Sequence, residues 1–317
     1  MSREPWVVYL REFHLRNQSN EIHKHLKSLR RSSATFLVSL SWSHHSESVV
    51  LRLVRELREW REKYPHFNWV VLTNTKEEAL NFQQQGQASE WVHHNAFVDP
   101  TVFSLQSKVK KKWDAVYNAA LSPYKRHELA REVKSLGLIT YDFGLVNERE
   151  YRENIRKDLI RAHWFNYVGK AYRYLSEEEV SRAHLQCRVG LCLSAEEGGM
   201  MASIQYLLAG LPVVTTPSMG GRDVFFDPDY VLTVEASPEA VASGVQEMIR
   251  RNLDSEWIRQ RSLEKMKVHQ KRLLNMLRRL SAVEYGEGVD DEQIWVNLLE
   301  RNRRVWTLGD WSDLNGV

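Results

Sequence analysis

Short apolar runs alternate along the chain with longer segments in which apolar residues recur every three or four positions. The runs at 6–10 and 36–40 are almost wholly apolar, which is typical of buried strands. The segment at 48–60 places Leu51, Val54 and Leu57 on one stripe, which predicts a helix with one buried face. In the first part of the chain we expect strands at 6–10, 36–40, 69–72 and 90–94, and helices at 48–60 and 76–85.

The alternation breaks near Asp99 and Pro100, where a polar and basic segment follows. A second alternating series then begins, so we place a domain boundary here. In this series Ser176 and Glu179 have the spacing of a capping box, and Pro238 stands at the first position of a helix. The series predicts strands at 113–118, 138–141, 165–168, 189–193, 212–215 and 230–234, and helices at 125–135, 148–161, 176–187, 238 onward and 255–282.

Two alternating series predict two doubly wound α/β domains. We expect an unusually short N-terminal domain at 1–106, a second domain at 107–285, and a C-terminal helix and tail at 286–317. A chain of 317 residues is long enough for two domains, and 43% hydrophobic with 27% charged residues is typical of soluble globular proteins.

The chain has neither a membrane-spanning apolar run nor a charged-then-apolar leader, so we expect a cytoplasmic protein. Cys187 and Cys192 lie in apolar surroundings and are interpreted as core residues in a reducing compartment. The formal charge of +3 is too small to indicate a nucleic-acid partner. Basic residues gather at 11–31 and 265–279, as solvated helix faces or as surfaces for an anionic acceptor or the periphery of an anionic membrane.

The loop at 195–199 carries the most specific chemistry, because it follows the predicted strand at 189–193. Ligands of open parallel sheets bind beyond the carboxyl ends of the strands. Gly198 and Gly199 allow close backbone approach, and Glu197 can accept hydrogen bonds from sugar hydroxyls. Gln205, eight residues after Glu197, projects from the same helical face. An ordinary strand–loop–helix connection with glycines for tight packing would have the same local pattern.

The motif from Glu197-Gly-Gly through Gln205 and Gly210 to Pro212-Val-Val resembles the nucleotide-sugar signature of retaining GT-B glycosyltransferases of the family 4 type. Further segments resemble that family in the same order along the chain, over roughly residues 90 to 250. They are Asn95 to Phe103, Tyr117-Asn118 followed by Lys125, Val168-Gly169, and Thr215 to Gly221.

This resemblance implies two Rossmann-like domains facing a cleft, the first for the acceptor and the second for the donor. It implies transfer of a sugar from a nucleotide-sugar donor to a saccharide, lipid-linked or protein acceptor, with retained anomeric configuration and without a metal or other cofactor. Glu197 would position the sugar, and Lys125 would stabilise the departing diphosphate. The implied donor-binding residues are Asn118, Lys125, Arg126, Glu197, Gly198, Gly199, Met200, Met201 and Gln205.

The chain departs from the family pattern at two places. Gln205 stands where the family has a second Glu that holds the donor ribose, and Ala119 and Ala120 stand where an Arg is usual. An amide can still accept from a hydroxyl but lacks the charge-assisted strength of a carboxylate, about 1–2 kcal/mol in a partly dry site. These departures leave a catalytically inactive sugar-nucleotide-binding scaffold as the alternative function. A nucleotide-sugar epimerase of the same fold is a further alternative, for which the sequence offers no convincing acid/base pair.

The histidine pair His44-His45 follows a predicted strand, where the family often has a catalytic His near the transferred sugar. Either residue is therefore a candidate catalytic group beside Glu197 and Lys125. Neither this pair nor His93-His94 has a carboxylate or cysteine at the spacing that a zinc site would need. Asp227-Pro-Asp229 spells a metal-binding D-x-D, but its turn residues favour a structural loop.

Overall fold

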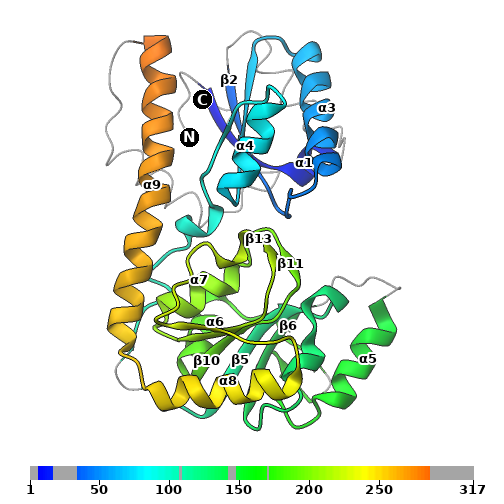
Figure 1. The fold of residues 1–317 in the computed structure, drawn as a ribbon, viewed down its shortest axis with the longest axis vertical. Helices are drawn as coiled ribbons and strands as arrows, with labels where there is room; N and C mark the ends of the chain where they lie inside the picture. The colour runs from blue at the N-terminus through cyan, green and yellow to red at the C-terminus, as the bar shows by residue number, and fades with distance from the viewer. Residues whose placement is uncertain (1–5, 17–33, 107–108, 142–147, 170, 286–317) are drawn as a thin grey trace. The chain divides into compact units, whose positions relative to one another are not determined.

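The alternating apolar runs form two separate parallel sheets (Figure 1), each within its own compact unit. The computed structural model describes residues 6–16, 34–106, 109–141, 148–169 and 171–285. The first unit comprises 1–97 with 267–317, and the second comprises 98–266. Among the described residues, no helix is long and apolar enough to cross a membrane.

The sheet of the first unit contains four parallel strands in the order of the sequence, β1-β2-β3-β4. Every residue of β2 is buried, as expected for a central strand covered on both faces. Its bounds and those of its neighbours are β1 Trp6–Arg11, β2 Ala34–Ser39, β3 Phe67–Leu72 and β4 Ser89–Glu90, with helices α1 Glu12–Arg16, α3 Glu47–Lys63 and α4 Lys76–Gln84 and the short 3-10 helix η1 His94–Phe97.

Alternate residues of this sheet enter two different apolar cores. Phe36 on β2 packs in a cluster with Leu57 of α3 and Phe82 of α4. Leu37, on the opposite face, lies in a second cluster with Leu273 and Leu277 of the long helix α9, Ser255–Tyr285. Burying a leucine side chain stabilises by about 1.5–3 kcal/mol. This burial explains why the end of α9 belongs to the first unit.

The predicted domain boundaries therefore differ from the observed division. The expected division at 106/107 lies at 97/98, and residues from 267 onward belong to the first unit rather than to the second. The periodicity of α9 revealed an amphipathic helix but not the sheet that receives its apolar face. The predicted tail at 286–317 and most of the basic run at 11–31 lie outside the described residues.

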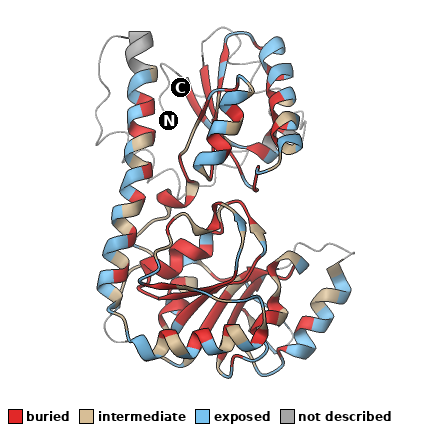
Figure 2. Ribbon diagram, in the orientation of Figure 1, coloured by how far each residue is buried: buried red, intermediate tan, exposed pale blue. Residues whose placement is uncertain are grey.

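The second unit contains a six-stranded parallel sheet in the order β14-β12-β10-β5-β6-β7. The strands are largely buried (Figure 2). From β5 the chain adds strands in one direction through β6 and β7, and from β10 it adds them in the other direction. The switch point between β5 and β10 is where ligands bind in doubly wound sheets. The strands are β5 Trp113–Ala120, β6 Leu136–Tyr141, β7 His163–Trp164, β10 Cys187–Cys192, β12 Val213–Thr215 and β14 Val231–Thr233.

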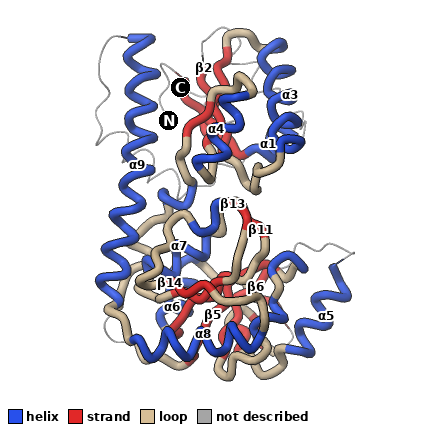
Figure 3. The backbone as a smooth tube through the Cα atoms, in the orientation of Figure 1, coloured by secondary structure: helices blue, strands red, loops and turns tan. Residues whose placement is uncertain are grey.

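Helices and two small strand pairs complete this unit (Figure 3). The predicted capping box of Ser176 and Glu179 is confirmed at the start of α6, and Pro238 stands at the start of α8. The helices are α5 Arg149–Asp158, α6 Glu177–Leu185, α7 Met201–Leu208 and α8 Pro238–Arg251. The pairs are parallel β11 Glu196–Glu197 with β13 Met219–Gly220, and antiparallel β8 Tyr167–Val168 with β9 Ala171–Tyr172.

Two predicted elements of this unit are wrong. The helix expected at 125–135 is replaced by the 3-10 helices η2 Pro123–Lys125 and η3 His127–Ala130. Arg126 between them has a φ of 52°, a left-handed conformation that interrupts a helix. The strand expected at 165–168 is divided, because β7 ends at Trp164 and β8 forms a hairpin with β9 instead.

Candidate functional site

Lys125 and Glu197, two predicted site residues, meet at the switch point of the second sheet. Lys125 ends the short turn after β5, and Glu197 lies in the loop after β10. Lys125 Nζ donates a hydrogen bond to Glu197 Oε1 across 72 residues of sequence, and the side chains are only 5% and 7% exposed. A buried ion pair of this kind holds a cation and a hydrogen-bond acceptor ready in a place of low dielectric.

The preceding strand fixes the turn that carries Lys125. Pro123 stands at its first position, and the Tyr117 hydroxyl of β5 donates to the Lys125 backbone oxygen at 2.5 Å. Burial raises the pKa of Tyr117 well above its usual value, so this hydroxyl remains a donor at neutral pH. The Lys125 ammonium also lies 5.0 Å from the centre of the Tyr124 ring. These contacts fix the turn from which the Lys125 side chain reaches Glu197.

Arg126, predicted to contact donor phosphates, is engaged with the protein itself. Its Nε donates to the Leu193 backbone oxygen at 2.6 Å, and its NH2 group donates to Thr216 Oγ1 at 2.7 Å. Those contacts join the ends of β10 and β12. Arg126 thus lies near the start of the loop at 195–199, through contacts to Leu193 and Thr216 that sequence reasoning did not predict.

The predicted glycine loop leads directly into α7. Gly198 is buried and Gly199 half-buried, and α7 begins at Met201 after Met200, which makes no side-chain cap. Met200 is buried, whereas Met201 is 39% exposed. Because the first amides of a helix lack intrahelical partners, this helix start can present backbone N–H groups to an anion.

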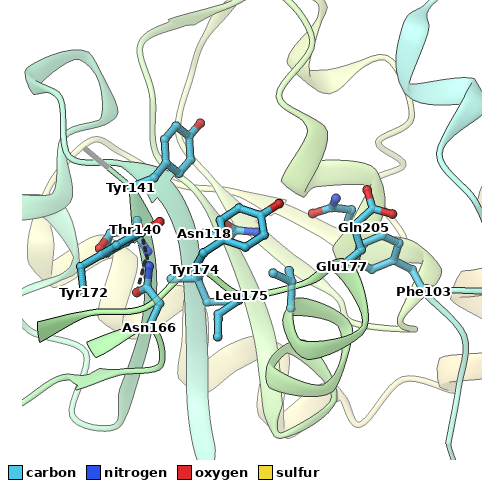
Figure 4. Close-up of a pocket in the computed structure, with 12 residues that line it drawn as sticks. Phe103, Asn118, Thr140, Tyr141, Asn166, Tyr172, Tyr174, Leu175, Glu177 and Gln205 are labelled. Carbon is cyan, nitrogen blue, oxygen red and sulfur yellow. Dashed lines mark hydrogen bonds between the residues drawn. The ribbon is translucent and has the colours of Figure 1, made fainter. Parts of the chain in front are cut away.

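A pocket of about 300 Å³ in the same unit takes in two more predicted residues, Asn118 and Gln205, whereas Lys125, Glu197 and the two glycines are not among its lining residues (Figure 4). Gln205 projects from α7 at one end, near Phe103 and Glu177, and Tyr141 stands toward the other end. Polar and aromatic side chains together suit a ligand with both hydroxyl groups and a planar ring. The remaining lining residues are Ile139, Thr140, Asn166, Tyr172, Tyr174, Leu175 and Val180.

Asn118 is held at the floor of this pocket by two aromatic neighbours. Its backbone N–H donates to the Tyr206 hydroxyl at 2.6 Å, and its Nδ2 lies 3.4 Å from His184 Nε2. Burial lowers the pKa of His184 to about 3, so the imidazole is neutral and its Nε2 can accept from the amide. In this arrangement the Asn118 side-chain nitrogen is directed at His184.

The two histidine candidates lie in the first unit and differ in exposure. His44 is 1% exposed, its Nδ1 lies 3.1 Å from the Trp42 backbone oxygen, and its Nε2 lies 3.6 Å from the Glu12 carboxylate. His45 is exposed, and its Nδ1 lies 2.9 Å from Ser43 Oγ. His44 therefore has the surroundings of a structural histidine, and His45 is the one open to solvent.

Arg222 is the residue near the loop that sequence reasoning missed. Its side chain is fully buried and contacts backbone oxygens at the ends of β10 and β12. The segment from Thr215 to Gly221 before it belongs to the resemblance, but arginines are so commonly exposed that the sequence gives no reason to expect burial of Arg222. Only the folded arrangement reveals it.

The D-x-D segment has a structural role in this unit. Asp227 lies 3.1 Å from Lys265 Nζ and 3.7 Å from Arg261, and its carboxylate accepts from the Asp229 backbone N–H. Within the described part of the chain, no group of three or more His, Cys, Asp or Glu residues is arranged to hold a metal ion.

Comparisons with known proteins find solved structures with a similar fold. No protein-family model and no curated protein matches the chain in sequence. Anabaena HepE, solved with UDP-glucose, is 12% identical with a TM-score of 0.56, covering 94% of this chain and 78% of HepE. Sucrose-phosphate synthase from Thermosynechococcus elongatus is 12% identical with a TM-score of 0.59, covering 87% of this chain and 74% of that enzyme.

A third similar structure is the pneumococcal O-GlcNAc transferase GtfA, solved with UDP and GlcNAc. It is 14% identical with a TM-score of 0.55, and the match covers 83% of this chain and 60% of GtfA. Likeness at this level of identity concerns the fold, and it agrees with the parallel α/β architecture of both units. The chain has the GT-B fold of glycosyltransferases.

Proposed function

We propose that this protein transfers a sugar from a nucleoside-diphosphate donor to an acceptor, with its donor site in the second unit. The observation that carries the proposal is the buried Lys125–Glu197 pair at the β5/β10 switch point, in the same unit as the pocket that contains Asn118 and Gln205. HepE, solved with UDP-glucose, and GtfA, solved with UDP and GlcNAc, support a nucleotide-sugar as the ligand.

In this proposal each residue has a distinct part. Lys125 moves its hydrogen bonds from Glu197 to the diphosphate and stabilises the charge that develops as the diphosphate leaves. Glu197 then accepts hydrogen bonds from the sugar hydroxyls and positions the ring. Gln205 accepts from a ribose hydroxyl, and the aromatic end of the pocket, with Tyr141 and Tyr172, receives the base.

Gly198, Gly199, Met200 and Met201, at the start of α7, complete the proposed donor-binding set. The transfer retains the anomeric configuration and needs no metal, and the acceptor is a saccharide, a lipid-linked sugar or a protein. His45 is the histidine candidate for contact with the transferred sugar, because it is exposed. Contact of the basic N-terminal run with an anionic membrane belongs to the same proposal.

The first test is a thermal-shift panel with UDP-, GDP-, ADP- and CMP-sugars. A ligand that binds the native state raises its unfolding midpoint according to affinity and concentration. The donor chosen in this way is then incubated with candidate acceptors, and release of the nucleoside diphosphate is measured with and without a chelator. No release from any donor would contradict the enzymatic proposal. The product's anomeric configuration, determined by NMR, tests retention.

A second candidate is a sugar-nucleotide-binding protein without turnover. It is favoured by Arg126 and Arg222, whose guanidinium groups bind protein oxygens, and by Ala119 and Ala120 in place of the usual arginine. Fewer cations at the diphosphate would provide less stabilisation of the leaving group. Binding of a nucleotide-sugar with no diphosphate release would support this candidate over the first.

A further inference from the structure

Arg222 lies beneath the loop that carries Glu197 and is 0% exposed. It sits in the short 3-10 helix η5, Gly221–Asp223, directly after β13. The chain reaches it through Gly220, whose φ of 96° favours glycine. This turn places the guanidinium between the carboxyl ends of β10 and β12.

The guanidinium fills its hydrogen-bonding capacity on these two strand ends. NH1 donates to the backbone oxygens of Cys192 and Ser194, at 3.1 and 2.6 Å. NH2 donates to Thr215 Oγ1 at 2.7 Å and to the Thr216 backbone oxygen at 2.6 Å. Nε donates to the Asp223 carboxylate at 2.6 Å, and that carboxylate, 40% exposed, balances the buried charge. Only a planar group with five N–H donors can serve all these acceptors together.

These contacts hold the residue that immediately precedes the loop at 195–199. Ser194 stands two residues after the end of β10, and three residues later Glu197 pairs with Lys125. The loop also forms a parallel ladder with β13, in which Glu197 lies beside Gly220. The Ser203 hydroxyl of α7 reaches the Arg222 backbone oxygen at 3.3 Å, which ties the helix of Gln205 to the same point.

We infer that Arg222 is a positioning residue for the donor: by holding Ser194 it sets the direction of the loop and so presents Glu197 to the transferred sugar. This inference rests on the proposed function. It assigns the buried arginine a role exerted through Glu197 rather than through contact with a ligand. Lysine at this position would keep the charge but could not reach both strand ends at once.

The test is a double-mutant cycle between Arg222→Lys and Glu197→Gln, with UDP-glucose as the probe in calorimetry well below each unfolding midpoint. If Arg222 acts through Glu197, Arg222→Lys weakens binding about tenfold in the unaltered background and less than about twofold in the Glu197→Gln background. An equal loss in both backgrounds, or no loss, would overturn the inference. If Arg222→Lys does not fold, Asp223→Asn, which keeps the guanidinium, replaces it in the same cycle.

Amide hydrogen exchange of the ligand-free protein supplies a second readout. Arg222→Lys is expected to speed exchange at 194–200 and in β13 while leaving α8 unchanged. The control is Met248→Ala, a cavity in the buried face of α8 that destabilises the unit without touching the loop. Unchanged loop exchange would overturn the inference on its own. If the unaltered protein binds no UDP-glucose, the proposed function is refuted for that donor. Faster loop exchange in Arg222→Lys would then show that Arg222 only stabilises the loop.

Discussion

Each unit buries a glutamate carboxylate near its parallel sheet, but the two carboxylates have different partners. Glu78, in α4 of the first unit, accepts three backbone N–H groups, from His44, Asn74 and Thr75, at 2.7 to 3.1 Å. Glu197, in the second unit, is paired with the side chain of Lys125. One carboxylate is bound by the main chain and the other by a movable ammonium group.

The difference in partners distinguishes a carboxylate that stabilises the fold from one that can bind a ligand. The amides of Thr75 and Asn74 belong to a capping box and to the turn before it, and that of His44 belongs to the segment after β2, so a ligand could not take their place without unfolding main chain. A lysine side chain can rotate toward an arriving phosphate and leave its carboxylate to bind hydroxyls. Burial alone therefore does not mark a functional carboxylate, and the proposed function depends on the exchangeable partner of Glu197.

The largest expected effect tests the structural half of the comparison. Glu78→Ala leaves three backbone N–H groups without their acceptor, and each such loss costs about 1–3 kcal/mol. With three amides affected, we expect the free energy of unfolding to fall by about 6 kcal/mol, measured by urea denaturation. Binding of UDP-glucose by the folded protein should remain unchanged. Glu77→Ala, at the exposed neighbouring position, is the matched control and should change neither quantity. Weakened UDP-glucose binding in Glu78→Ala would contradict the assignment of Glu78 to a purely structural role.

Removal of Lys125 tests the functional half. Lys125→Met removes the cation and leaves Glu197 uncompensated, so we expect UDP-glucose binding to weaken about a hundredfold and stability to fall by about 3–5 kcal/mol. Combining Lys125→Met with Glu197→Leu should restore most of the stability but not the binding, because a buried pair can be replaced by apolar groups. Calorimetry and denaturation measure the two effects separately.

The control for this experiment is Lys134→Met, which alters an exposed lysine of the same unit. It should bind UDP-glucose as the unaltered protein does. Normal binding by Lys125→Met would remove the observation on which the proposed function rests.

The buried histidines extend the comparison to pH. Burial lowers the pKa of His127 and His184 in the second unit to about 3, and that of His269 in the first to about 4. Their unfolded pKa is about 6.5, so only the unfolded chain takes up protons between these values. With respect to these histidines, the free energy of unfolding has its full value above pH 6.5. It falls as the pH is lowered, by about 1.4 kcal/mol per pH unit for each histidine.

Denaturation at a series of pH values checks this expectation. His184→Phe should reduce the dependence of the second unit's stability on pH by about 1.4 kcal/mol per pH unit, which is the contribution of one histidine. His269→Phe should cause the same reduction in the first unit. An unchanged slope in either variant would show that the ring is not held neutral by burial.

The smallest effect concerns Gln205. If its amide meets a ribose hydroxyl, Gln205→Glu should tighten UDP-glucose binding by about 1–2 kcal/mol, because a carboxylate accepts more strongly. Gln260→Glu, which adds the same charge at an exposed position of α9, is the control. No difference between the two variants would remove Gln205 from the ribose contact, without affecting the role of Lys125.

The local pattern of apolar and capping residues predicted many of the helices and strands. The predictions that failed have a common cause, which is a contact made only in the folded chain. The strand–loop–helix order around Glu197 and the capping box at Ser176 follow from apolar period and from cap chemistry. The turn of Lys125 was expected as the start of a helix, since nothing near it in sequence reveals that the Tyr117 hydroxyl holds its carbonyl. The burial of Arg222 depends on two strand ends that approach it only in the folded sheet.

The sequence by itself determined the alternation of strands and helices and the polar residues that follow β5 and β10. These features depend on neighbours within a few positions, which local periodicity encodes. Tertiary structure alone decided that β5 and β10 are adjacent, that Lys125 therefore meets Glu197, and that α9 covers the first sheet. The order of the strands depends on the burial of apolar residues throughout each unit, so it cannot be predicted from any short segment of the sequence.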